Sequence, residues 1–148
     1  MFTLDRPFIR LQKGYGHAEV FPDFQSMDSL DAYIKDDLRR NGYKRRARRH
    51  ISRAFCAAFR NTMDYNNGEE GKPVYVAWLI SKGKKPSVII QIAGNMYVPY
   101  SESNGDGNKD AMSRVGMMHR HVHDANFSIV NNAEGERICT KVTMTYKK

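Results

Sequence analysis

The sequence contains few residues that could cross-link it. Only two cysteines, Cys56 and Cys139, occur in 148 residues, and they stand far apart in no metal-ligand spacing. One disulfide is arithmetically possible, but such a pair is more typical of two buried free thiols in a reducing cytoplasm. We therefore expect neither a disulfide-stapled fold nor a cysteine zinc site.

Long apolar segments are also absent. No run approaches the roughly 18 apolar residues that a membrane-spanning helix needs. The first residues, MFTLDRPFIRLQKG, lack the basic-then-apolar layout of a signal peptide. With 41% hydrophobic and 27% charged residues, the composition is that of an ordinary globular protein. We expect a soluble cytoplasmic protein with no membrane partner, folded as a single domain over residues 1–148.

Motifs of the common catalytic classes are missing as well. The chain has no phosphate-binding P-loop, no glycine-rich dinucleotide turn and no nucleophile elbow. Each of these motifs places backbone groups or a nucleophile where the chemistry needs them, so their absence argues against the corresponding enzyme classes. The sequence favours a binding protein over an enzyme, with no cofactor.

A further absence is local, because no Asp or Glu occurs from Leu38 to Met63. The whole chain has 24 basic and 16 acidic residues and a formal net charge of +8. Removing the nine cations of this span leaves 15 basic residues against 16 acidic ones. The excess charge therefore belongs to one segment, whose cations are Arg39, Arg40, Lys44, Arg45, Arg46, Arg48, Arg49, Arg53 and Arg60.

The same segment has the periodicity of an amphipathic helix over about residues 44–63. Placed at about 100° per residue, its apolar and its basic residues separate onto opposite sides. The apolar side holds Ala47, Ile51, Ala54, Phe55, Ala58 and Thr62. The basic side holds Arg45, Arg46, Arg49, Arg53 and Arg60. The pattern predicts a helix that packs one face on the core and turns a row of guanidinium groups outward.

This row predicts contact with a polyanion. Like charges four residues apart destabilise a helix, and Arg45, Arg49 and Arg53 form such a series without an intervening acid. Arginine also grips phosphate bidentately. We therefore predict that all nine cations bind nucleic acid, mainly through its backbone, or an acidic or nucleoprotein surface. The alternative is that the arginines pair with acids elsewhere in the chain, such as Asp23, Asp36 and Asp37.

Three histidines near the C-terminal end are the second candidate site. His119, His121 and His123 precede Asp124, and imidazole is a good ligand for zinc and other transition metals. The triplet His121-Val122-His123 resembles the His-hydrophobic-His element of rolling-circle replication and mobilisation endonucleases. In that family the element lies on a central strand and a catalytic tyrosine on a following helix, whereas here the only later tyrosine, Tyr146, falls in an expected strand. A zinc or manganese site at these histidines is the alternative to exposed side chains at a helix end.

The remaining pattern predicts an α+β fold. Apolar runs at residues 74–81, 87–94 and 96–101 are expected to form a meander of about three antiparallel strands, with a hairpin turn at Gly94-Asn95 and a central middle strand. Terminal strands are expected within 2–12, 16–21, 127–130 and 137–146, the first of them an edge strand or a bent strand because of Pro7. Two or three helices should cover one face of this sheet.

Two further helices are expected on either side of the meander. The first should be capped by Asp28 or Ser29 and end at Asn41-Gly42, with an inner stripe of Leu30, Tyr33, Ile34 and Leu38. The last should span residues 109–124 and face inward with Met112, Val115 and Met118 or His119.

Three functions fit these patterns. The first is a small, non-enzymatic nucleic-acid-binding protein that docks the arginine row on phosphates. The second is an inhibitor or adaptor, of the kind that viruses and plasmids encode, whose basic helix occupies an acidic or nucleic-acid-binding surface of a larger complex. The third is a metal-dependent nuclease that uses the cluster from His119 to Asp124.

Overall fold

The computed structural model describes residues 8–12, 15–65, 73–94 and 109–148. Its elements follow the chain as β1 (Phe8–Gln12), β2 (Tyr15–Val20), α1 (Phe24–Arg40), α2 (Arg45–Tyr65), β3 (Val74–Ser81), β4 (Ser87–Gly94), α3 (Lys109–His121), β5 (Asp124–Asn131) and β6 (Arg137–Lys147). The expected strand at 96–101 and the turn at Gly94-Asn95 lie outside the described residues.

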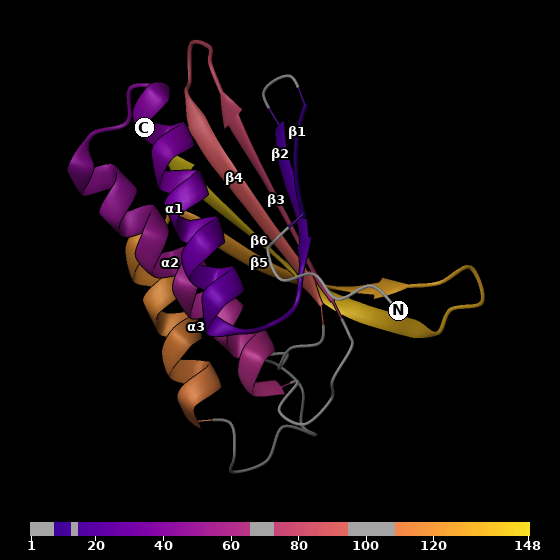
Figure 1. The fold of residues 1–148 in the computed structure, drawn as a ribbon. Helices are drawn as coiled ribbons and strands as arrows, with labels where there is room; N and C mark the ends of the chain where they lie inside the picture. The colour runs from indigo at the N-terminus through magenta and orange to yellow at the C-terminus, as the bar shows by residue number, and fades with distance from the viewer. Residues whose placement is uncertain (1–7, 13–14, 66–72, 95–108) are drawn as a thin grey trace.

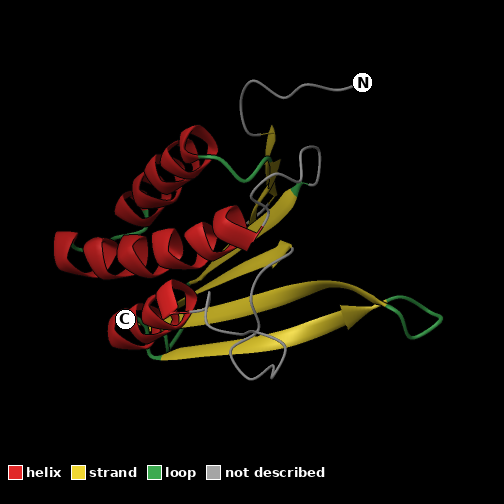
Figure 2. Ribbon diagram, turned by 90° about the horizontal axis from the view of Figure 1, so that it is seen from below, coloured by secondary structure: helices red, strands yellow, loops and turns green. Residues whose placement is uncertain are grey.

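The strands within the described residues form one antiparallel sheet of six, in the order β1-β2-β3-β4-β6-β5. The three helices lie together on one face of it (Figures 1 and 2). This arrangement confirms the predicted α+β class. It also confirms that β1 is an edge strand and that β4 is central, since β4 pairs with β3 on one side and β6 on the other.

Helix α1 begins earlier than its sequence suggested. Asp23, and not Asp28 or Ser29, is the N-cap, and its carboxylate accepts a hydrogen bond from the Ser26 backbone N–H at 2.7 Å. A carboxylate at this position satisfies an N–H group that has no partner within the helix. The helix ends as predicted, because Asn41 is its C-cap and Gly42 takes a positive φ of 83°, which glycine adopts without steric cost.

The apolar stripes of the helices pack on the sheet around Trp78, whose side chain is 1% exposed. In α1 the buried stripe is Leu30, Ile34 and Leu38, whereas Tyr33 is 43% exposed. Tyr33 was expected inside but lies at the margin of that stripe. The Trp78 ring lies so close over Gly16, its partner residue in β2, that a Cβ atom there would overlap the indole.

Helix α3 ends sooner than expected. It runs from Lys109 to His121, and β5 begins at Asp124. Val115 and Met118 are buried as predicted, but Met112 is 45% exposed. Val122, just after the helix, is also buried. The chain then enters the edge strand β5 at Asp124 instead of continuing the helix.

Candidate polyanion-binding surface

Helix α2 lies between α1 and α3 in the helix layer (Figure 2). Its inner side is buried against the sheet and its neighbours through Ile51, Ala54, Phe55, Ala58 and Phe59. On the opposite side five cations are exposed, four of them in the first half of the helix and the fifth beyond the buried Ala57. We name these five cations the arginine face: Arg45, Arg46, Arg49, Arg53 and Arg60. The predicted helix and its division into a buried and an exposed side are therefore confirmed.

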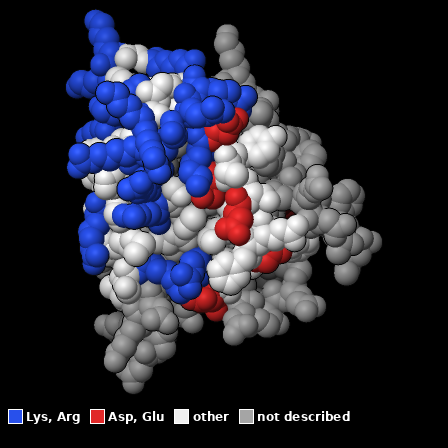
Figure 3. Space-filling model, turned by 60° about the vertical axis from the view of Figure 1, so that its left-hand side comes forward, with Lys and Arg blue, Asp and Glu red and all other residues white. Residues whose placement is uncertain are grey.

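The arginine face has no acidic partner within the described part of the chain. The ion pairs there join other residues: Asp31 with Lys35, Asp36 with Arg39 and Arg40, and Asp64 with Arg114. Arg60 contacts Phe24, with its guanidinium carbon 5.9 Å from the centre of the ring. Figure 3 shows Lys and Arg side chains gathered over this side of the molecule, with acidic side chains along its margin.

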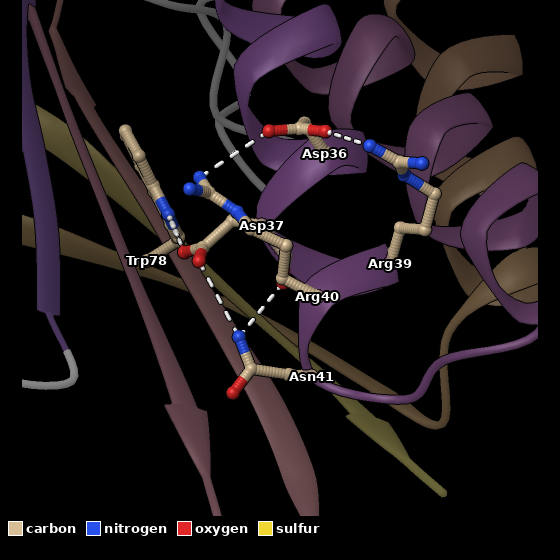
Figure 4. Close-up of polar contacts among 6 residues, drawn as sticks. All are labelled: Asp36, Asp37, Arg39, Arg40, Asn41 and Trp78. Carbon is tan, nitrogen blue, oxygen red and sulfur yellow. Dashed lines mark hydrogen bonds and ion pairs between the residues drawn. The ribbon is translucent and has the colours of Figure 1, made fainter.

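Two of the acids that the sequence offered as partners for the arginines, Asp23 and Asp37, have other hydrogen-bond partners. Asp23 caps α1. Asp37 accepts a hydrogen bond from the Trp78 indole N–H at 3.0 Å and is approached by the Asn41 amide at 3.4 Å (Figure 4). Asp37 therefore fastens the end of α1 to β3, and its carboxylate is held away from α2.

Arg39 and Arg40 differ from the arginine face, although the sequence grouped all of them together. Both approach the Asp36 carboxylate, at 2.7 Å and 3.3 Å (Figure 4). The hydrogen bond from Arg39 is the main reason why the pKa of Asp36 lies below its ordinary value, and the charges of both arginines add to it. This trio is a local pattern of residues three and four apart on one helix.

The last two predicted cations lie where α2 begins. Lys44 is exposed, and its carbonyl accepts the Arg48 backbone N–H at 3.0 Å. Arg48 is half-buried, and one guanidinium nitrogen donates to the Tyr43 carbonyl at 2.9 Å. Arg48 therefore closes the turn into α2.

A hollow of about 390 Å³ opens on the side of α2 that faces α1. We name it the arginine hollow. Its lining combines one residue of α1 with five residues from the first half of α2: Lys35, Arg45, Arg48, Arg49, Ser52 and Arg53. Sequence reasoning missed Lys35, because only the packing of α1 against α2 brings it to these arginines. Ser52 lies on α2 itself, three residues after Arg49.

The three candidate metal-binding histidines do not share a site. His121 Nδ1 lies 2.8 Å from His50 Nδ1 of α2. His123 Nδ1 accepts the Lys147 backbone N–H at 2.8 Å, and its ring packs edge-on against Tyr146. His119 is exposed. In the part of the chain that is described, no three His, Cys, Asp or Glu side chains are grouped as metal ligands would be.

The His50–His121 contact lies beside the arginine face. Burial, and next the charges of His50, Arg53 and Arg120, lower the pKa of His121. The two Nδ1 atoms can share one proton, but they cannot both carry one at this distance. The pair therefore joins α2 to the end of α3 most firmly when at least one ring is neutral.

Lys148 adds a cation that no sequence pattern indicated. Its ammonium nitrogen lies 4.8 Å from the centre of the Tyr43 ring, a cation–π distance. Its backbone N–H donates to the Pro86 carbonyl at 3.0 Å. The pairing of β6 with β4 therefore brings the last residues of the chain to the start of α2.

Comparisons with known proteins add no family. No protein-family description matches the chain, and no curated protein matches it either. Among the described residues, no helix is long and apolar enough to cross a membrane, and both cysteines are free thiols. The function is therefore inferred from geometry and charge.

Proposed function

We propose that the protein is a small, non-enzymatic nucleic-acid-binding protein that docks the arginine face on the phosphate backbone. The observation that carries this proposal is the set of five exposed guanidinium groups with no acidic partner among the described residues. From Arg45 to Arg60 they extend over about 22 Å, at roughly 1.5 Å per helical residue.

The energetics of the face support an external anion. Repulsion between like charges four residues apart destabilises a helix by a few tenths of a kcal/mol for each pair. A row of phosphates would turn that repulsion into attraction. Each arginine can also present a planar pair of N–H groups to two phosphate oxygens.

The surroundings of the face favour contact with backbone over the reading of bases. Three polar side chains of α2 could have contacted base edges, and all are engaged within the protein. His50 contacts His121, Ser52 donates to Asp31 at 2.6 Å, and Asn61 is buried and accepts from Arg114. Since α1 and α3 flank α2, its outer side is part of a broad surface. These features support binding with little sequence preference.

An acidic protein surface would offer the same charges as a nucleic acid. The inhibitor or adaptor function is therefore the competing proposal, and it predicts a partner that stays bound after nuclease treatment. The nuclease alternative has less support, because the histidines it requires have separate partners.

Salt-dependent binding to a panel of DNA and RNA duplexes and single strands tests the proposal. If about five phosphate contacts form, log affinity should fall against log salt concentration with a slope of about −4 or −5. Replacing Arg46, Arg49 and Arg53 together with Ala should remove most of this slope. A slope near zero, or unchanged binding by the triple variant, would contradict the proposal.

A further inference from the structure

The arginine hollow differs in shape from the rest of the basic surface. Its lining surrounds a space of about 390 Å³ with five cations and one hydroxyl. Arg46 and Arg60, which belong to the same helix, are not among the lining residues. The extended row can follow a chain of phosphates, whereas the hollow is one space that several cations line together.

The charge of the hollow is only partly balanced from within. Asp31 is the nearby acid, and its side chain is 15% exposed. It lies 3.0 Å from the Lys35 ammonium and accepts the Ser52 hydroxyl at 2.6 Å. These contacts neutralise one cation and use the only hydroxyl proton, so the four arginines of the lining keep their charge.

Arg48 is the best-placed donor in this set. Its bond to the Tyr43 carbonyl fixes one end of the guanidinium group. A guanidinium group has five N–H donors, so several remain for a ligand. A side chain that is already held in place loses little conformational freedom on binding.

We infer that the arginine hollow binds a terminal phosphate, meaning a phosphate monoester or the end of a polyphosphate. Such a group carries about −1.5 to −2 charge near neutral pH and three acceptor oxygens, whereas a backbone diester carries a single charge. Four guanidinium groups that line one hollow match the more highly charged group. This inference deepens the proposed function, because the hollow shares Arg45, Arg49 and Arg53 with the arginine face.

A comparison of two duplexes tests this inference. They have the same sequence and differ only in ending with a 5′-phosphate or a 5′-hydroxyl. At low salt we expect the phosphorylated duplex to bind about tenfold more tightly, the amount that one additional charge-assisted hydrogen bond supplies. Inorganic pyrophosphate, a free source of the same chemistry, should displace it.

Variants locate the effect within α2. Arg48→Ala should abolish the preference for the phosphorylated end, whereas Arg46→Ala, which removes the same charge two residues away, should keep it. Lys35→Ala provides a second test on an exposed position of another helix, in case the half-buried Arg48 is needed for folding. Lys35→Ala should reduce the preference at least severalfold.

The possible results separate the two proposals. Equal binding of both duplexes, with no displacement by pyrophosphate, would contradict terminal-phosphate binding in the arginine hollow. It would not contradict binding of the nucleic-acid backbone by the arginine face. The inference would also be contradicted if the preference for the phosphorylated duplex persisted in Arg48→Ala and Lys35→Ala but was lost in Arg46→Ala. Pyrophosphate binding without duplex binding would support the hollow for a free phosphate compound and contradict the proposed function. No binding of any probe would contradict both.

Discussion

Helices α1 and α2 lie side by side, and both are amphipathic and rich in charge, yet they manage that charge differently. In α1 the basic residues Lys35, Arg39 and Arg40 each lie within 3.3 Å of a carboxylate of the same helix. In α2 the five residues of the arginine face have no carboxylate partner among the described residues. Both helices bury an apolar side in the core.

The difference teaches that the arrangement of charge matters more than its amount. The cations of α1 already have their counter-ions, so they gain little from an external anion. The cations of α2 repel one another until an anion arrives. A protein that used arginine only for solubility would normally mix both signs on one surface, as α1 does.

The largest effect on nucleic-acid binding is expected when an acid is placed among the arginines of α2, as in α1. Arg49→Glu places an acid four residues from both Arg45 and Arg53. Each new pair should stabilise the helix by about 0.2–0.5 kcal/mol, while nucleic-acid affinity should fall at least about tenfold, because the local charge changes by two. Thermal unfolding and binding at fixed salt measure the two effects together. Lower stability, or unaltered affinity, would count against this reading.

A smaller effect on nucleic-acid binding is expected when α1 loses the carboxylate that pairs with its arginines. Asp36→Asn removes the counter-ion of Arg39 and Arg40 and leaves both helices folded. We expect nucleic-acid affinity to rise by no more than about fivefold, since an exposed ion pair contributes little. Binding isotherms at low salt measure the change, and a loss of affinity would show that Asp36 positions the arginines productively.

The smallest effect concerns the stability of the fold beside the arginine face, and it depends on pH. The lowered pKa of His121 means that the folded protein binds fewer protons than the unfolded chain. The His50–His121 contact therefore stabilises the fold above the ordinary histidine pKa of about 6.5 and loses this contribution as the pH falls. His121→Gln should cost about 0.5 kcal/mol at pH 8, the low end of the range for one hydrogen bond, and less at pH 5. Urea unfolding at pH 8 and at pH 5 measures this cost. An equal cost at the two pH values would show that protonation of His121 does not affect the stability of the fold.

The sequence predicted the features that depend on local periodicity. The 100° spacing of Ile51, Ala54 and Phe55 identified the buried side of α2, and Asn41-Gly42 identified the end of α1. The pairing of Asp36 with Arg39 and Arg40 was also predictable from their spacing of three and four, but the acid-free span begins at Leu38, two residues after Asp36.

Features that join distant segments could not be predicted in this way. His50 and His121 meet because α2 packs on α3, and Lys148 reaches Tyr43 because β6 pairs with β4. Met112 and Tyr33 were placed inside because their spacing fits a helical stripe, but a stripe has margins, and only packing decides which of its residues are covered.

Two double variants with the same loss of charge test the central claim most directly. Arg49→Ala with Arg53→Ala removes two unpaired cations from α2, and Arg39→Ala with Arg40→Ala removes two paired cations from α1. In salt titrations of nucleic-acid binding, the α2 variant should reduce the slope by about two units, and the α1 variant by less than about one. Equal reductions in the two variants would show that net charge, and not the unpaired face of α2, determines binding.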